Sequence, residues 1–80
     1  MNVGDTLELI SETKRFLIDD YEYVTRKKSP NTKDLLNHVR DSYKEGDLDE
    51  LLEEVLLEYD LDNVDEEYKV LLLVAACVSV

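Results

Sequence analysis

The chain has 80 residues, of which 44% are hydrophobic, and its formal net charge is −11. A chain of this length forms one domain, over residues 1–80, and buries only about 60% of the surface that its unfolded form exposes. Two glycines and one proline leave few breaks, which favours helices over many short strands. The composition therefore predicts a small all-α domain of four helices.

The cysteine count and the hydropathy indicate where in the cell the protein is expected. A single cysteine, Cys77, cannot form an internal disulfide, so the fold requires no oxidising environment and we expect a cytoplasmic protein. The first five residues lack the features of a signal peptide, and no segment has the roughly 18 apolar residues of a membrane span. We expect no contact with a membrane.

The charge is distributed unevenly along the chain. Residues 1–44 hold eight acidic and eight basic residues, whereas residues 45–80 hold twelve acidic residues and one base, Lys69. All twelve acids lie between Glu45 and Glu67, so this segment accounts for the whole net charge. Such asymmetry favours a charged partner, although an acidic surface also serves solubility.

The first helix is expected to begin at Asp5 or Thr6, because Asp5 and Glu8 have the spacing of a capping box. The basic run 26–28 and Pro30 are expected to end it. Apolar residues at three-, four- and seven-residue steps define its expected buried stripe. These residues are Leu7, Ile10, Leu17, Tyr21 and Val24, with Lys14 in the gap and Phe16 and Tyr23 beside them.

Residues that are typical of helix ends predict two further helices. Ser29 or Asn31 is the expected cap of the second helix, and Gly46 its left-handed end. Asp47, with Glu50 three residues on, is the expected cap of a third, strongly amphipathic helix with an acidic outer face. Its expected buried residues are Leu48, Leu51, Leu52, Val55, Leu56 and Tyr59.

The C-terminal run from Tyr68 to Val80 is almost entirely apolar, and Asn63 and Glu66 before it have capping spacing. Its β-branched valines leave a strand open for residues 70–80, but its leucines and alanines favour a helix. An all-round apolar helix has no face suited to water. It is therefore expected at the core of the domain or at a dimer interface.

We expect no enzyme activity, no cofactor and no metal site. The segment 60–63 resembles the start of a calcium loop, but the sixth and twelfth positions of that loop are not glycine and glutamate. His38 and Cys77 are too few for zinc. His38 is expected on a helix surface, and Cys77 in the core, where burial raises the pKa of a thiol. The acids of the third helix are expected to be hydrated, which is unsuited to carboxylate catalysis.

Several families are similar to the chain in size and charge. Acyl carrier proteins are similar, but the only Asp-Ser pair here, Asp41–Ser42, lies near the end of a helix and is followed by Tyr43 rather than leucine. Phage-encoded DNA mimics and immunity proteins that neutralise nuclease toxins are also similar, on size and charge alone. The net charge of −11 disfavours direct binding of nucleic acid despite the basic cluster at 26–28.

The acidic segment predicts a binding function. If the segment is helical, its twelve acids give about one charge per 3 Å, close to the phosphate spacing of about 3.4 Å along a DNA strand. We expect a non-catalytic, DNA-mimic or inhibitor type of protein that occupies a basic, nucleic-acid-binding surface of a partner protein. The expected partner-binding residues are Asp49, Glu50, Glu53, Glu54, Glu58, Asp62, Asp65 and Glu66. An acidic face kept for solubility, or an oligomerisation module that forms a homodimer through its apolar C-terminal helix, are the open alternatives.

Overall fold

A computed structural model describes residues 3–60 and 64–79 of the chain. It contains α1 (Val3–Thr25), α2 (Thr32–Glu45), the 3-10 helix η1 (Leu48–Leu51), α3 (Glu53–Glu58) and α4 (Glu66–Val78). The described residues include no strand, so the prediction of a small all-α domain of four helices is confirmed. The C-terminal run is helical up to Val78, which decides against a strand there. No helix in the described part of the chain is both long and apolar enough to cross a membrane.

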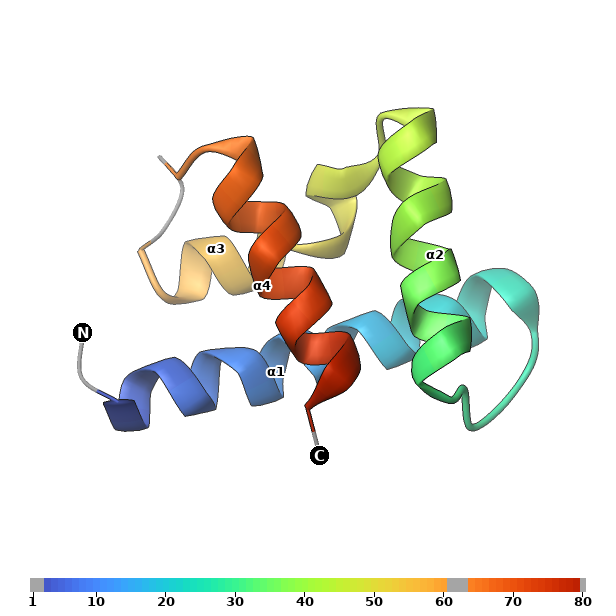
Figure 1. Cartoon of the computed structure of the whole chain (residues 1–80), viewed down its shortest axis with the longest axis horizontal. Helices are drawn as coiled ribbons and strands as arrows, with labels where there is room; N and C mark the ends of the chain where they lie inside the picture. Colours follow the sequence, from blue (N-terminus) through green and yellow to red (C-terminus); the bar gives the residue numbers. More distant parts are fainter. Residues whose placement is uncertain (1–2, 61–63, 80) are drawn as a thin grey trace.

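The helices form a layered arrangement in which α4 is central. Figure 1 shows α1 along one side of the molecule, with α2 and α4 lying across it and with η1 and α3 connecting them. α4 packs against both α1 and α2, and α3 lies against α1. This arrangement brings two segments that are distant in sequence, α1 and α3, onto one side of the domain.

The core draws side chains from all these elements. Its fully buried leucines are Leu9 and Leu17 of α1, Leu35 of α2, Leu52 between η1 and α3, and Leu73 of α4. α4 buries only one side, through Leu72, Leu73, Ala76 and Cys77. Its other side carries the exposed residues Leu71, Val74 and Val78, so this helix is only partly enclosed.

The buried side of α1 differs from the expected stripe. The buried positions are Leu9, Thr13, Leu17 and Tyr21, at four-residue steps, whereas the predicted Leu7, Tyr23 and Val24 are exposed. The hydroxyl of Thr13 donates to the carbonyl oxygen of Leu9 at 2.7 Å, so this polar side chain is satisfied inside its own helix and takes a core position. The predicted Leu17 and Tyr21 are buried, whereas Leu9 and Thr13 were not part of the predicted stripe.

Lys14, which filled a gap in the expected stripe, instead joins α1 to the end of α4. Its Nζ atom donates to the carbonyl oxygen of Ser79 at 2.5 Å. The last carbonyl groups of a helix and the residues after it lack partners within the helix, and a cation there is also favoured by the helix dipole. The contact therefore helps to hold the C-terminal end of α4 on α1.

The helix ends show which cap signals were correct. Asn31 caps α2 and forms a capping box with Asp34, and Gly46 ends α2 in the left-handed conformation with a φ of 79°, both as predicted. α1 begins at Val3, before the predicted cap at Asp5 or Thr6. α4 is capped by Asp65, whose carboxylate accepts from the backbone N–H of Tyr68 at 2.8 Å, whereas the predicted cap, Asn63, lies outside the described residues.

The predicted third helix is divided into two short segments. Asp47 makes no side-chain capping bond, and a 3-10 helix is followed by six α-helical residues, with Leu52 at the junction. All the residues predicted to be buried there are buried, except Tyr59, which is half-buried. A 3-10 helix repeats every three residues, so Leu48 and Leu51 point the same way into the core. Of the two acids between them, Glu50 lies with Glu53 and Glu54 of α3, whereas Asp49 forms an ion pair with Lys69 of α4.

Candidate acidic interface

A group of carboxylates lies in a hollow between α1 and the η1–α3 segment. The hollow has a volume of about 390 Å³. It is lined by five carboxylates, Asp19, Asp20, Glu50, Glu53 and Glu54, and by four apolar or aromatic residues, Phe16, Tyr23, Leu51 and Val55. Three predicted binding residues, Glu50, Glu53 and Glu54, therefore lie together, and α1 adds two carboxylates that were not predicted.

Four of these five carboxylates have no charged partner. Asp19, Glu50, Glu53 and Glu54 form no ion pair and no side-chain hydrogen bond within residues 3–60 and 64–79. Glu50, Glu53 and Glu54 are all exposed to solvent. Their charges are therefore available to a partner.

The fifth carboxylate, that of Asp20, is joined to His38. The Oδ2 atom of Asp20 lies 2.8 Å from Nε2 of His38, whose side chain is only 11% exposed. The His38 ring also meets the edge of the Tyr21 ring, with 5.5 Å between the centroids. A carboxylate accepts hydrogen bonds, so Nε2 of His38 is the donor. The prediction that His38 lies on a helix surface was wrong, because the crossing of α2 over α1 encloses its ring.

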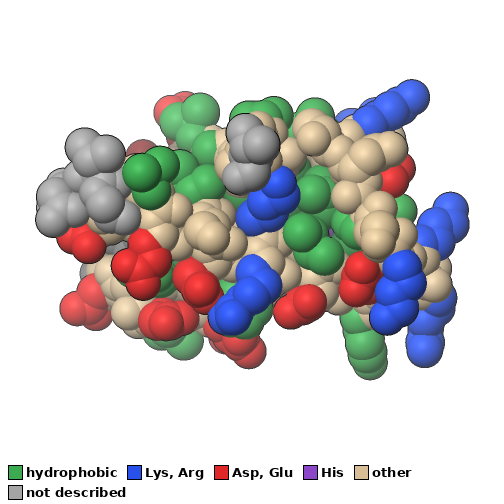
Figure 2. All heavy atoms as spheres, turned by 90° about the horizontal axis from the view of Figure 1, so that it is seen from below, with side chains coloured by type: hydrophobic (Ala, Val, Ile, Leu, Met, Phe, Trp, Pro, Cys, Tyr) green, Lys and Arg blue, Asp and Glu red, His purple; other side chains and the backbone are tan. Residues whose placement is uncertain are grey.

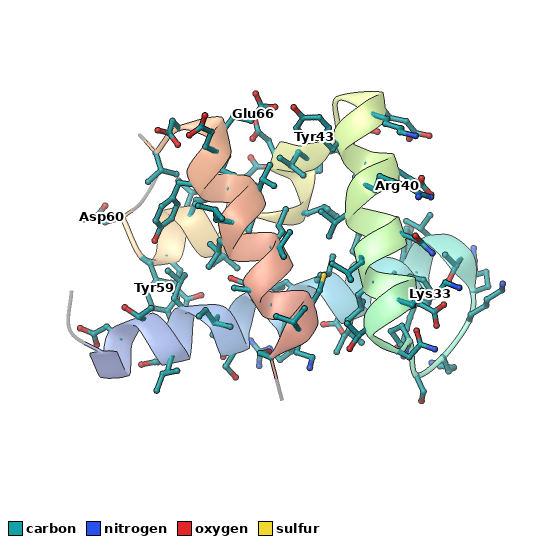
Figure 3. The ribbon with its side chains drawn as sticks, in the orientation of Figure 1. Lys33, Arg40, Tyr43, Tyr59, Asp60 and Glu66 are labelled. Carbon is teal, nitrogen blue, oxygen red and sulfur yellow. The ribbon has the colours of Figure 1, made fainter. Side chains whose placement is uncertain are left out.

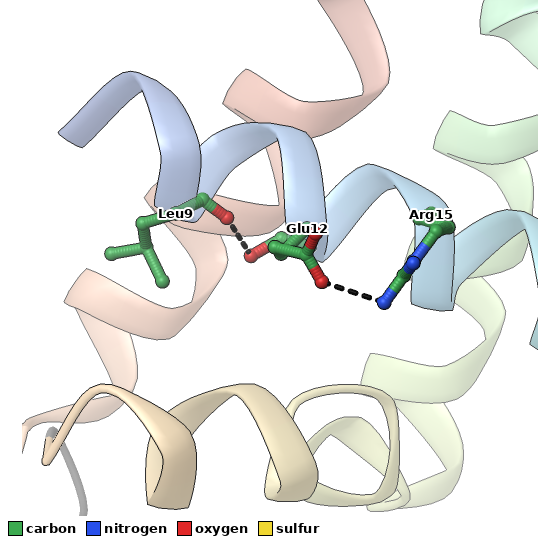
Figure 4. A network of polar contacts seen from close by, with 4 residues as sticks. Leu9, Glu12 and Arg15 are labelled. Atoms are coloured by element: carbon green, nitrogen blue, oxygen red, sulfur yellow. Dashed lines mark hydrogen bonds and ion pairs between the residues drawn. The ribbon is translucent and has the colours of Figure 1, made fainter. Parts of the chain in front are cut away.

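A second group of carboxylates surrounds Tyr59 at the end of α3. Partial burial, followed by the negative charges of Glu8, Glu58 and Glu12, raises the pKa of Tyr59 above its usual value of 10. Tyr59 therefore lies near the predicted residue Glu58 and near two carboxylates of α1. Figure 4 shows α3 running alongside α1 at this point, with Glu12 held by Arg15 at 2.7 Å.

We name the combined surface of these two groups the acidic face. Its members are Glu8, Glu12, Asp19 and Asp20 of α1, Glu50 of η1, and Glu53, Glu54 and Glu58 of α3. Figure 2 shows acidic side chains mainly over the half of the molecule that holds the N-terminal end of α1. Lysine and arginine side chains are most numerous at the opposite end, which holds the connection from α1 to α2.

The other four predicted binding residues are placed differently. Asp49 forms an ion pair of 2.8 Å with Lys69 of α4, and Asp65 caps α4 through its carboxylate. Glu66 lines a different groove, between α2 and α4. Asp62 lies outside the described residues. The predicted residues therefore do not form one strip along one helix.

The α1 members of the acidic face were missed because charge was counted along the sequence. Residues 1–44 have no net charge, but four of their bases, in the run 26–28 and at Lys33, lie after the end of α1 at Thr25. The acids of α1 are therefore not neutralised by these bases. Glu8, Glu12 and Asp19 are separated by four and seven residues, a spacing that places them on one side of a helix. That spacing was the available signal.

No protein-family model, curated protein or solved structure matches the chain. In the described part of the chain, no group of three or more His, Cys, Asp or Glu side chains could hold a metal ion. Cys77 is fully buried, as predicted, and desolvation raises its pKa to about 11 although the charge of Lys14 acts in the opposite direction.

The hollow in the acidic face suits the side chain of a lysine or arginine. Its aromatic and aliphatic floor can hold the methylene stem, while the carboxylates at its edge can bind the charged head. The two aromatic rings that line the hollow each form a cation–π contact with an arginine of the same chain. Arg15 lies over the ring of Phe16 at 5.3 Å and Arg26 over that of Tyr23 at 5.9 Å.

Proposed function

We propose that the protein is a non-catalytic acidic binding protein whose acidic face occupies a basic surface of a partner protein. One observation carries the proposal: five carboxylates from α1, η1 and α3 line a single hollow, and four of them have no charged partner among the described residues. Like charges gathered on one surface repel one another, which costs folding free energy. A cationic partner removes that cost and gains ion pairs.

The binding energy is spread over many residues. An exposed ion pair contributes only about 0 to 1 kcal/mol, so no single carboxylate of the acidic face is decisive. The same charges act at longer range and accelerate the encounter with an oppositely charged surface. Both effects weaken as salt is added, because the Debye length falls from about 10 Å at 0.1 M salt to about 3 Å at 1 M.

We further propose that the partner surface is one that binds nucleic acid. Such surfaces present lysines and arginines at the spacing of phosphates and release bound counterions on association. The acidic face presents carboxylates from two neighbouring segments around a hollow, so it can bind the same cations as a phosphate backbone. The protein would then act as an inhibitor of the DNA-mimic type.

Affinity capture tests this proposal. The immobilised protein is expected to retain a nucleic-acid-binding protein from a cell lysate and to release it when either salt or competing double-stranded DNA is added. Glu50→Lys, Glu53→Lys and Glu54→Lys together are expected to abolish retention while the helical circular dichroism stays unchanged. Retention that resists both salt and DNA contradicts the proposal, and so does the absence of any saturable binding, which is what an acidic face kept for solubility would give.

A further inference from the structure

Another concave site in the described part of the chain lies between α2 and α4, away from the acidic face. This groove has a volume of about 720 Å³ and an apolar floor that includes Leu36, Val39 and Val70. None of its lining residues belongs to α1, η1 or α3. An occupant of the groove would therefore leave the acidic face uncovered.

An exposed apolar ridge runs along α4, and two of its residues, Leu71 and Val74, also line this groove. Leu71, Val74 and Val78 are 68%, 38% and 58% exposed, at three- and four-residue spacing on one side of the helix. Tyr43, which is 52% exposed, extends from α2 toward the start of α4 (Figure 3). Contiguous exposed apolar surface of this kind marks an interaction site more often than isolated apolar residues do.

We propose that the α2–α4 face, which we define as this groove together with the ridge of α4, binds a second copy of the chain. The face contains both a ridge and a groove. In a dimer with two-fold symmetry, the ridge of each copy would pack into the groove of the other. Interfaces between identical chains have this self-complementary form, and helices pack by placing ridges in grooves.

Charge complementarity supports a second copy as the occupant. Glu66 and Glu67 form an acidic edge of the groove on α4, and Arg40 lies on its α2 side (Figure 3). Lys33 and Lys44 are seven residues before and four residues after Arg40, so they extend a basic edge along α2. In a two-fold pair, the acidic edge of each copy meets the basic edge of the other, and the contact is made twice.

The extent of the molecule on the side of α2 and α4 sets an upper limit on the area that the α2–α4 face can bury. The molecule measures 34 by 26 Å across the view of Figure 1, which looks onto α2 and α4. A standard interface buries about 800 Å² on each partner. The dimer would also carry two acidic faces, although this inference does not depend on their function.

Sedimentation equilibrium tests the proposal with two matched substitutions. The wild-type protein is expected to form dimers as its concentration rises to about 1 mM. Leu71→Glu is expected to weaken dimerisation at least about tenfold, because it places a charge in the centre of the apolar interface. Leu57→Glu, at a similarly exposed leucine of α3, is the control and is expected to have no effect, with circular dichroism used to verify that both variants fold.

A charge exchange tests the proposed contact between the edges. The Glu66→Lys, Glu67→Lys variant and the Arg40→Glu, Lys44→Glu variant are each expected to dimerise more weakly than wild type. An equimolar mixture of the two is expected to form heterodimers, because every contact across the interface then joins opposite charges. A protein that stays monomeric at about 1 mM, equal effects of Leu71→Glu and Leu57→Glu, or a mixture that stays dissociated overturns the proposal.

Discussion

Leu52 tests how the carboxylates of the acidic face are held in place. α3 has only six residues, and isolated helices shorter than about 12 to 15 residues are marginal in water. The orientation of Glu53 and Glu54 therefore depends on burial of the apolar residues beside them. Leu52 is fully buried at the junction of η1 and α3 and is the largest fully buried side chain of this segment.

Leu52→Ala is expected to lower the free energy of unfolding by about 2 to 5 kcal/mol. This range combines the lost transfer free energy of the removed atoms with the cost of the cavity that they leave. For a domain of this size, each kcal/mol lowers Tm by roughly 4 to 8 °C, so Tm is expected to fall by at least about 8 °C. Urea unfolding followed by circular dichroism measures the change.

Leu57→Ala is the matched control, because Leu57 lies on the same short helix but is 64% exposed. Its effect on the free energy of unfolding is expected to stay within about 0.5 kcal/mol. Equal losses for the two substitutions would show that α3 is not held by its buried side, and the account of the acidic face would then be wrong.

Three smaller predictions concern single groups. Asn31→Ala removes the capping box of α2 and is expected to cost about 1 kcal/mol in thermal or urea unfolding; an unchanged stability would show that the cap is not formed in solution. The thiol of Cys77, with a pKa of about 11, is expected to react with iodoacetamide at pH 8 only when denaturant is added, and rapid labelling of the folded protein would contradict its burial. The phenol of Tyr59 has a raised pKa, so the folded state binds its proton more tightly than the unfolded state and stability falls as pH rises above 10. Tyr59→Phe is expected to make this fall shallower in unfolding experiments, and an identical pH profile would exclude the proposed neighbours.

Local signals in the sequence predicted local structure well. The cap at Asn31 and the left-handed end at Gly46 depend only on residues within one turn, and both are confirmed. The apolar residues of the η1–α3 segment were also identified correctly, because their burial requires only that one side of the segment face the core. The break at Leu52 was not foreseen, since an unbroken helix presents the same apolar pattern.

Features that depend on which helices are neighbours could not be obtained in the same way. Thr13 occupies a core position because α1 turns that side toward the rest of the domain, and its hydroxyl is satisfied within the helix. Asp19 and Asp20 join Glu50 only because α1 and the η1–α3 segment lie together. A count of charge along the chain does not contain that information, so the α1 half of the acidic face was found only in the structure.

The central claim is that the acidic face itself, and not the overall negative charge, binds a basic partner. Two variants with the same change in net charge test it most directly. Glu50→Lys, Glu53→Lys and Glu54→Lys alter the acidic face, whereas Asp41→Lys, Glu45→Lys and Asp47→Lys alter exposed acids at the end of α2 and the start of the next segment. Affinity for the captured partner, measured at fixed salt, is expected to be lost in the first variant and largely kept in the second. Equal losses in both variants would contradict the claim.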